Sequence, residues 1–185
     1  MQIQWYPGHM TKARRAMQED LKLVDLVMEL TDARAPLAGR NPDIDKLAAG
    51  KARMIFLNKA DLADDQATLW MDYFRKKGIT PIRLDARKTN FKKAVVDGVK
   101  IACQEKIERD RRKGILNRPI RAMVVGIPNV GKSTFINSLA GRQLQRQEIS
   151  QVLRVETSGS RSTNSLSFLI RQVFCGLSLM MRQSE

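Results

Sequence analysis

The run GIPNVGKS at residues 126–133 constrains the fold of this chain more than any other feature. It matches the pattern G-x-x-x-x-G-K-[ST] and lies between RAMVV and TFINSLAG, which predict a buried strand and a helix. Gly126 and Gly131 permit a tight turn, so that successive N–H groups at the start of the helix can surround phosphate oxygens. The sequence therefore predicts a phosphate-binding loop within an α/β fold.

Individual residues of this loop have predicted roles. Lys132 would neutralise charge on the β and γ phosphates of a nucleotide, and Ser133 would place its hydroxyl on Mg²⁺. The further nucleotide contacts that the pattern predicts come from Asn129, Val130, Gly131 and Thr134. The alternative interpretation is a glycine-containing strand-to-helix turn that binds no nucleotide.

The rest of the first 142 residues alternates short apolar runs with amphipathic stretches. The apolar runs predict strands at 24–30, 53–57, 81–84 and 122–125. The amphipathic stretches predict helices at 9–22, 41–49, 64–78, 89–113 and 132–140. This alternation favours an α/β fold with a mostly parallel sheet covered by helices on both faces, which gives three layers.

A second candidate site is the segment NKAD at residues 58–61, which follows the apolar run MIFL. It therefore stands at the carboxyl end of a predicted strand, where open α/β sheets bind ligands. The Asp61 carboxylate can accept two N–H donors side by side, which guanine offers through N1 and N2 and adenine does not. Asn58 would brace the site, and the Lys59 stem would lie along the base. An exposed turn closed by a local Asx bond is the alternative.

A third element, Asp85-Ala86-Arg87, follows the next predicted strand. G domains usually carry Ser-Ala-Lys at this point, where the backbone N–H of a small residue reaches the guanine O6. Ala86 fits that role, and we expect Arg87 to lie beside the nucleotide as well. Asp85 and Arg87 depart from the usual residues.

These three elements occur in the order base motif, small-residue loop, phosphate loop, whereas an ordinary G domain begins with its phosphate loop. That is the order of a circularly permuted GTPase. With WYPGHM at 5–10, DARAP at 32–36 and RNP at 40–42, the chain resembles the bacterial ribosome-biogenesis GTPase A family over residues 1–142. The resemblance implies that residues 1–142 form a circularly permuted P-loop GTPase fold that is incomplete at its C-terminus, because family members carry a further helical domain.

The same resemblance implies a function. It predicts a cytoplasmic GTPase that binds GTP and GDP with Mg²⁺, associates with the pre-50S ribosomal subunit, and acts in late assembly of the large subunit. His9 is the one histidine of the chain and lies in the family-like YPGHM segment, so it is a candidate for orienting the attacking water. A structural or merely exposed histidine is the alternative.

The last 43 residues, 143–185, differ in composition from the rest. They contain eight Ser and no Lys, Asp, Ala or Pro, and they lack the PGVT and DxPG motifs that a GTPase of this family needs near the γ phosphate. Read in another frame, residues 150–154 permit a choice of codons that encodes PGVT, and residues 169–174 permit one that encodes DTPGI. We therefore interpret 143–185 as an aberrant tail that is out of frame and poorly ordered. The alternative is a genuine, divergent tail that folds as strands.

The net charge is +14, from 33 Lys and Arg against 19 Asp and Glu. A basic field attracts anionic partners, and here it favours contacts with the rRNA phosphate backbone. Two clusters carry this prediction: Lys12, Arg14 and Arg15, and Arg109, Arg111, Arg112 and Lys113. Most charge runs are only solvated surfaces, which is the alternative interpretation.

Two other expectations concern cellular context. Cys103 and Cys175 stand apart from each other and from any metal-binding pattern, which predicts no disulfide and fits a reducing compartment. The apolar stretch 165–181 is interrupted by Arg171 and Gln172, so no membrane association is expected. Two competing functions remain at this point: a truncated, non-hydrolysing fragment that binds guanine nucleotide or rRNA, and an unrelated P-loop ATPase.

Overall fold

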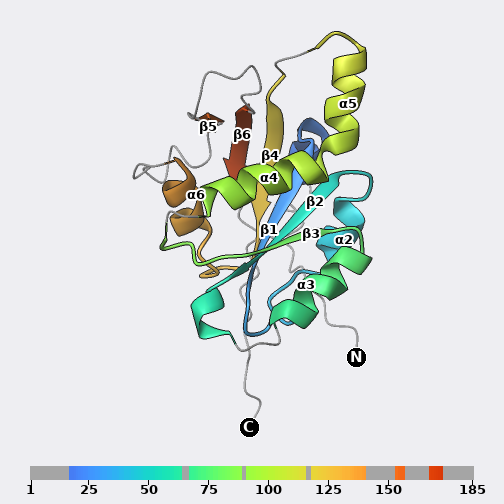
Figure 1. The fold of residues 1–185 in the computed structure, drawn as a ribbon. Helices are drawn as coiled ribbons and strands as arrows, with labels where there is room; N and C mark the ends of the chain where they lie inside the picture. Colours follow the sequence, from blue (N-terminus) through green and yellow to red (C-terminus); the bar gives the residue numbers. More distant parts are fainter. Residues whose placement is uncertain are drawn as a thin grey trace.

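Six strands form one sheet in the order β3-β2-β1-β4-β6-β5 (Figure 1). The computed structural model describes residues 17–63, 67–88, 91–115, 118–140, 153–156 and 167–172. The strands are β1 (Leu26–Asp32), β2 (Ala52–Asn58), β3 (Thr80–Arg83), β4 (Ile120–Val125), β5 (Leu153–Glu156) and β6 (Ser167–Gln172). Four of them lie at the positions that the apolar runs predict.

Helices follow or precede these strands along the chain. They are α2 (Asp43–Leu47), α3 (Ala67–Lys76), α4 (Lys92–Ala102), α5 (Gln104–Arg112) and α6 (Lys132–Ala140), with a 3-10 turn η1 (Ala60–Leu62) and helical residues at 17–23. None of the helices in the described part of the chain has the length and apolar character needed to cross a membrane.

The strand directions place the candidate site. Among the described strands, β1, β2, β3, β4 and β6 run in the same direction, and β5 runs antiparallel to its neighbour β6. This confirms the prediction of a mostly parallel sheet. Because parallel strands end at the same edge, the segments that follow β1, β2, β3 and β4 converge at one edge of the sheet.

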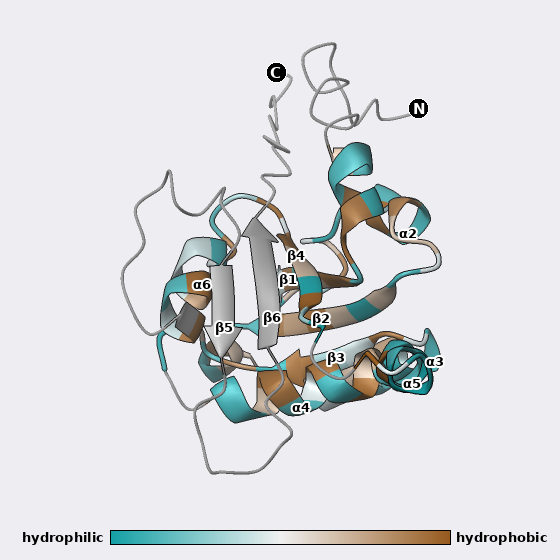
Figure 2. Cartoon of the chain, turned by 90° about the horizontal axis from the view of Figure 1, so that it is seen from above, coloured by the Kyte–Doolittle hydropathy of each residue, from teal (hydrophilic) through white to brown (hydrophobic). Residues whose placement is uncertain are grey.

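Helices cover both faces of the sheet, as the three-layer prediction requires. Alternate residues of one strand enter different cores: Met28 packs in a cluster with α4 and α6, while its neighbour Val27 packs with α2 and residues 17–23. Likewise Phe56 faces the first cluster and Leu57 a third one, which is built around Phe74 of α3. Figure 2 shows α2 on one side of the sheet and α4 on the other. Strands buried on both faces explain the continuous apolar runs of the sequence.

The single helix expected at 89–113 is wrong, because the chain breaks at Cys103 into α4 and α5, which run in different directions (Figure 1). Cys103 has φ −105° and ψ 14° and is buried, so the backbone leaves helical geometry there. The change of direction lets Lys106 of α5 approach Asp25 at the start of β1, with 3.6 Å between Nζ and Oδ1. Tertiary packing of the two helices on different parts of the sheet overrides the continuous helical pattern.

Two segments of the region expected to be an aberrant tail belong to the sheet. β6 pairs with β4 from Ile120 opposite Phe168 to Val124 opposite Gln172, and β5 pairs with β6. Residues 153–156 and 167–172 thus pair as strands, and the interpretation of 143–185 as an aberrant, poorly ordered tail stays a prediction. Other residues of 143–185 lie outside the described ranges, and the out-of-frame interpretation stays a prediction.

Candidate nucleotide-binding site

The loop between β4 and α6 adopts the backbone that its glycines predict. Gly126 has φ +152° and Gly131 has φ +97°, a region in which side chains are strained. A methyl group on Gly126 would lie 2.6 Å from the carbonyl oxygen of Leu30, so the loop passes directly over the end of β1. Asn129, which is exposed, also has a positive φ of +60°. The loop is thus a tight turn that opens into the first turn of α6.

Lys132 lies inside this turn and is 5% exposed. Its ammonium donates to the carbonyl oxygens of Gly126 at 2.9 Å and Ile127 at 2.7 Å. The charge is therefore held at the centre of the loop, where phosphate oxygens would approach. Ser133 and Thr134 follow on the first turn of α6 and are exposed, which leaves their hydroxyls and backbone N–H groups accessible to an anion.

Asn58 joins the base motif to the phosphate loop. Its side chain is buried at the end of β2, where Nδ2 donates to the Val130 carbonyl at 2.8 Å and Oδ1 accepts from the Ala86 N–H at 2.9 Å. One amide therefore fixes the loops that follow β2, β3 and β4 relative to one another. Gly131 makes room for it, since a methyl group there would lie 2.5 Å from Asn58 Nδ2.

The Ala86 N–H has a partner within the protein, and its predicted contact with a guanine O6 stays a prediction. That N–H is donated to Asn58, and the Ala86 carbonyl accepts from Ser138 Oγ of α6 at 2.7 Å. Both backbone groups of Ala86 are thus used to hold the loop between β2 and α6. Ala86 is 2% exposed, so a buried N–H needs this internal partner.

Lys59 and Asp61 stand beside this brace. Lys59 has φ +58°, and its ammonium lies 3.1 Å from Asp32 Oδ2 at the end of β1. Asp61 lies in η1 with a side chain that is 28% exposed, so its carboxylate is open to a ligand. The two residues flank the same edge of the sheet as the phosphate loop, which brings the predicted base and phosphate sites together.

Arg87 contacts two carboxylates at once. Its Nη2 donates to Asp61 Oδ2 at 2.6 Å and to Asp85 Oδ2 at 3.1 Å, and its Nε donates to Asp85 Oδ1 at 3.0 Å. The hydrogen bonds from Arg87 lower the pKa of Asp85, and those with Asp85 and Asp61 raise the pKa of Arg87. Arg87 therefore lies against Asp61 of the candidate base motif, and its predicted contact with a nucleotide stays a prediction.

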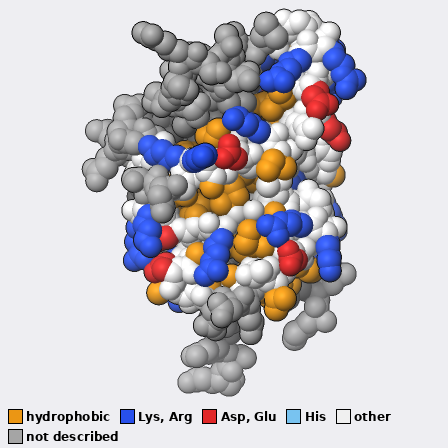
Figure 3. All heavy atoms as spheres, viewed as in Figure 1, with side chains coloured by type: hydrophobic (Ala, Val, Ile, Leu, Met, Phe, Trp, Pro, Cys, Tyr) orange, Lys and Arg blue, Asp and Glu red, His pale blue; other side chains and the backbone are white. Residues whose placement is uncertain are grey.

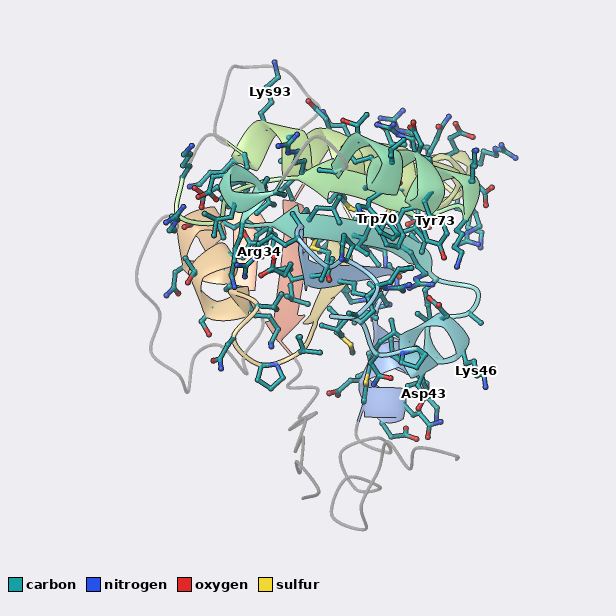
Figure 4. The ribbon with its side chains drawn as sticks, turned by 90° about the horizontal axis from the view of Figure 1, so that it is seen from below. Arg34, Asp43, Lys46, Trp70, Tyr73 and Lys93 are labelled. Atoms are coloured by element: carbon teal, nitrogen blue, oxygen red, sulfur yellow. The ribbon has the colours of Figure 1, made fainter. Side chains whose placement is uncertain are left out.

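Asp32 and Arg34 lie beside the candidate site, next to Lys59, and sequence reasoning did not single them out because DARAP served only to establish the resemblance. Arg34 donates to Asp32 from its backbone N–H, from Nε and from Nη2, at 3.0, 2.9 and 2.7 Å. These hydrogen bonds, with a smaller contribution from Lys59, hold the pKa of Asp32 well below its usual range. In Figure 4, Arg34 lies toward α6, while Asp43 and Lys46 lie on α2 in another part of the view. The missed signal is that Asp-Ala-Arg occurs twice, at 32–34 and 85–87.

A buried ion-pair network holds the chain between β1 and α2 against the sheet. Arg40 donates to both carboxylate oxygens of Glu29, at 2.9 and 2.8 Å, and to Asp45 at 2.7 Å. Arg53 of β2 joins the same network through Glu29 and Asp45. The network anchors the loop that contains Gly39, where an added methyl group would lie 3.7 Å from the Ile127 side chain of the phosphate loop. Arg40, in the RNP segment at 40–42, therefore helps to fix the loop that packs beside the phosphate loop.

Four residues that the sequence singled out lie outside the described part of the chain. They are His9, Lys12, Arg14 and Arg15.

In the described part of the chain, no group of three or more His, Cys, Asp or Glu side chains could hold a metal ion. A Mg²⁺ ion bound chiefly through nucleotide phosphates needs only one or two protein ligands, and the exposed hydroxyl of Ser133 fits such a position.

Comparisons with known proteins show which proteins this chain is similar to. A family model described as "50S ribosome-binding GTPase" matches residues 121–167. Ribosome biogenesis GTPase A of Priestia megaterium is 50% identical over 148 residues, which cover 79% of this chain and 51% of that protein. The chain is homologous to ribosome biogenesis GTPase A. Proteins of that name from Bacillus cereus and Thermotoga maritima are 50% and 37% identical to it.

Solved structures of YlqF match the fold as well. A GDP-bound structure has a TM-score of 0.57 at 28% identity and covers 84% of this chain and 56% of its own chain. A GNP-bound structure of YlqF from T. maritima has a TM-score of 0.59 at 27% identity, over 88% of this chain and 58% of its own. The circularly permuted GTPase fold is thereby confirmed. The chain spans about half the length of the ribosome biogenesis GTPase A relatives it matches.

Proposed function

We propose that this chain binds guanine nucleotides, hydrolyses GTP and acts in ribosome biogenesis, in late assembly of the large subunit. The observation that carries the proposal is the double contact of Asn58 with Val130 and Ala86. It places Asp61, the candidate base acceptor, at the same edge of the sheet as the phosphate loop. A purine nucleotide can then be bound at both ends, and homology to ribosome biogenesis GTPase A supports guanine as the base.

Each end of the nucleotide has its candidate partners. Lys132 and the N–H groups at the start of α6 would hold the phosphates, and Asp61 would accept from guanine N1 and N2. Ser133 would be the protein ligand of Mg²⁺, which supplies charge neutralisation on the β and γ phosphates when it is bound. Lys59, held by Asp32, would lie along the base.

Titration of the full chain with fluorescent GDP and ADP tests this assignment. We expect GDP to bind and ADP to bind at least 100-fold more weakly, because adenine offers no paired donors to Asp61. The Asp61→Asn variant should lose most of that preference, whereas Asp72→Asn, on the exposed surface of α3, should keep it. Equal binding of ADP and GDP would support a P-loop ATPase instead.

Hydrolysis is a separate question, because the printed sequence after α6 contains neither PGVT nor DxPG. This observation favours a second candidate function, a non-hydrolysing fragment that binds guanine nucleotide or rRNA. Phosphate release from GTP, measured with and without 50S particles, distinguishes the two. Turnover stimulated by 50S particles supports the GTPase, and nucleotide binding without turnover supports the fragment.

The proposed partner is the pre-50S subunit, contacted through its rRNA backbone. Arg109, Arg111, Arg112 and Lys113 are exposed at the end of α5. Figure 3 shows Lys and Arg side chains spread over the face where α4 and α5 lie. Reversing Arg111 and Arg112 to Glu should weaken 50S binding and flatten its dependence on salt, whereas Lys46→Glu on α2 should not. A ribosomal partner is also the reason to propose the cytoplasm as the location.

A further inference from the structure

The chain uses one local structure twice, at the ends of β1 and β3. In each copy of Asp-Ala-Arg, the arginine backbone N–H donates to the aspartate Oδ1 at 3.0 Å. In each copy the guanidinium also folds back on the same carboxylate, with Nε on Oδ1 and Nη2 on Oδ2. The result is a closed turn in which one atom of the Asp–Arg pair also contacts a charged side chain outside the turn. This bidentate pairing fixes the direction of both side chains.

The two turns contact the two charged side chains of the base motif. The turn at 32–34 presents Asp32 Oδ2 to the Lys59 ammonium at 3.1 Å. The turn at 85–87 presents Arg87 Nη2 to Asp61 Oδ2 at 2.6 Å. The anion Asp32 thus contacts the cation Lys59, and the cation Arg87 contacts the anion Asp61. Lys59 and Asp61 are therefore held from opposite sides by copies of the same tripeptide.

The contact with Arg87 leaves Asp61 able to bind a base. An ionised carboxylate has about four lone-pair positions on its two oxygens, and Arg87 occupies one of them on Oδ2. The remaining positions suffice for two parallel N–H donors such as those of guanine. Arg87 thus restricts the rotation of the Asp61 carboxylate without occupying all of its hydrogen-bonding positions.

Asp85 explains why an arginine is needed here. Its carboxylate is 9% exposed and shares the Arg87 Nη2 atom with Asp61. Two carboxylates on one nitrogen repel each other unless a cation lies between them. A bidentate guanidinium can satisfy Asp85 and still donate to Asp61, whereas a lysine ammonium cannot hold that planar geometry.

We propose that the two Asp-Ala-Arg turns are paired positioning devices for nucleobase recognition, with Arg87 directing Asp61 to the exocyclic amino group of guanine and Arg34 directing Lys59, through Asp32, to the face of the purine. The inference rests on the proposed guanine-nucleotide binding. It assigns different consequences to the two arginines. Loss of Arg87 affects the choice of base, and loss of Arg34 affects all purine nucleotides that share the same face.

Comparison of GDP with inosine diphosphate (IDP) tests the assignment in the full chain. IDP lacks only the 2-amino group, so the ratio Kd(IDP)/Kd(GDP) reports the contact with Asp61, while phosphate and ribose contacts cancel. We expect Arg87→Ala to lower this ratio about threefold, as for an exposed ion pair. Arg87→Lys should lower it less. Arg34→Ala should raise both Kd values and leave the ratio unchanged.

The controls separate this proposal from the function on which it rests. Arg75→Ala removes an exposed arginine paired with Asp72 on α3 and should change neither Kd. A wild-type ratio near one would overturn guanine binding at Asp61 itself. If the wild-type ratio is large, an unchanged ratio in Arg87→Ala overturns the role of Arg87, and a raised ratio would show that Arg87 competes with guanine. Because each ratio is measured within one variant, a smaller folded fraction does not alter it.

Discussion

Asn58 Nδ2 donates to the carbonyl oxygen of Val130 at 2.8 Å, although the two residues lie 72 positions apart in the chain. The bond connects the base motif at the end of β2 to the middle of the phosphate loop. Asn58 is 3% exposed and Val130 is 2% exposed, so neither group can exchange this partner for water. The candidate nucleotide site is therefore held together by a buried polar contact in the protein itself.

Removal of this side chain should cost stability. Asn58→Ala leaves the Val130 carbonyl and the Ala86 N–H buried without these partners, and we expect the free energy of unfolding to fall by about 3 kcal/mol. Urea denaturation, monitored by circular dichroism, measures this change in the free energy of unfolding. Gln104→Ala, which removes an exposed hydrogen bond on α5, should change it by less than about 0.5 kcal/mol. Equal denaturation midpoints for the two variants would contradict the prediction.

Gly131 should tolerate no side chain. Gly131→Ala combines a strained φ of +97° with a methyl group 2.5 Å from Asn58 Nδ2, so we expect loss of stability and at least tenfold weaker GDP binding. Gly50→Ala is the matched control, since it has a φ of +76° and open space around the added carbon. It should cost about 1 kcal/mol and leave GDP binding unchanged. GDP affinities that match between the variants would show that the contact with Asn58 is unimportant for binding.

The ion pairs of Asp25 should make stability depend on pH. Burial by itself would raise the pKa of Asp25, but hydrogen bonds from Arg121 and the charge of Lys106 outweigh it, so its pKa is lowered. A lowered pKa stabilises the fold above the unfolded value of about 3.9, and this contribution disappears as the pH falls through the folded value.

Asp25→Asn should therefore reduce the free energy of unfolding by about 2 kcal/mol at pH 7 and by less at pH 3. Thermal and urea unfolding at both pH values measure the difference. Asp72→Asn, which removes an exposed ion pair with Arg75, is the surface control and should change the free energy of unfolding at pH 7 by less than about 1 kcal/mol. A loss for Asp25→Asn that is the same at both pH values would contradict the assignment of this pair.

His9 provides a prediction about catalysis. If it orients the attacking water, His9→Ala should reduce GTP turnover stimulated by 50S particles while leaving GDP affinity nearly unchanged. Phosphate release and fluorescent GDP titration measure the two quantities. A parallel loss of affinity and turnover would instead indicate a structural role for this histidine.

The out-of-frame interpretation of 143–185 makes a prediction about the encoding DNA. We expect a one-base change near codon 142 or 143, after which the other frame encodes PGVT and then DTPGI. Sequencing across codons 140–150 provides the measurement. DNA whose other frame encodes neither motif would rule the interpretation out and leave β5 and β6 as strands of a genuine, divergent segment.

Much of the fold could be predicted because its signals are local. The apolar runs that form β1, β2, β3 and β4 are buried on both faces, and the motif at 126–133 has the glycines that its backbone requires. The break at Cys103 could not be predicted, because the helical pattern continues across it and the change of direction serves contacts with Asp25, far away in the chain. The bonds of Ala86 were missed for a similar reason, since Asn58 and Ser138 are distant in sequence.

The sequence by itself determined the layered α/β architecture and the turn at 126–133, and it predicted the residues of the candidate base motif. Backbone conformation at glycines and burial of apolar runs depend on residues close together in the chain, so they can be recognised there. Only the tertiary structure decided that Asn58 joins three loops and that Asp32 and Arg87 hold Lys59 and Asp61. These contacts form because parallel strands end at one edge of the sheet, where charged groups from distant segments meet and need partners of opposite sign.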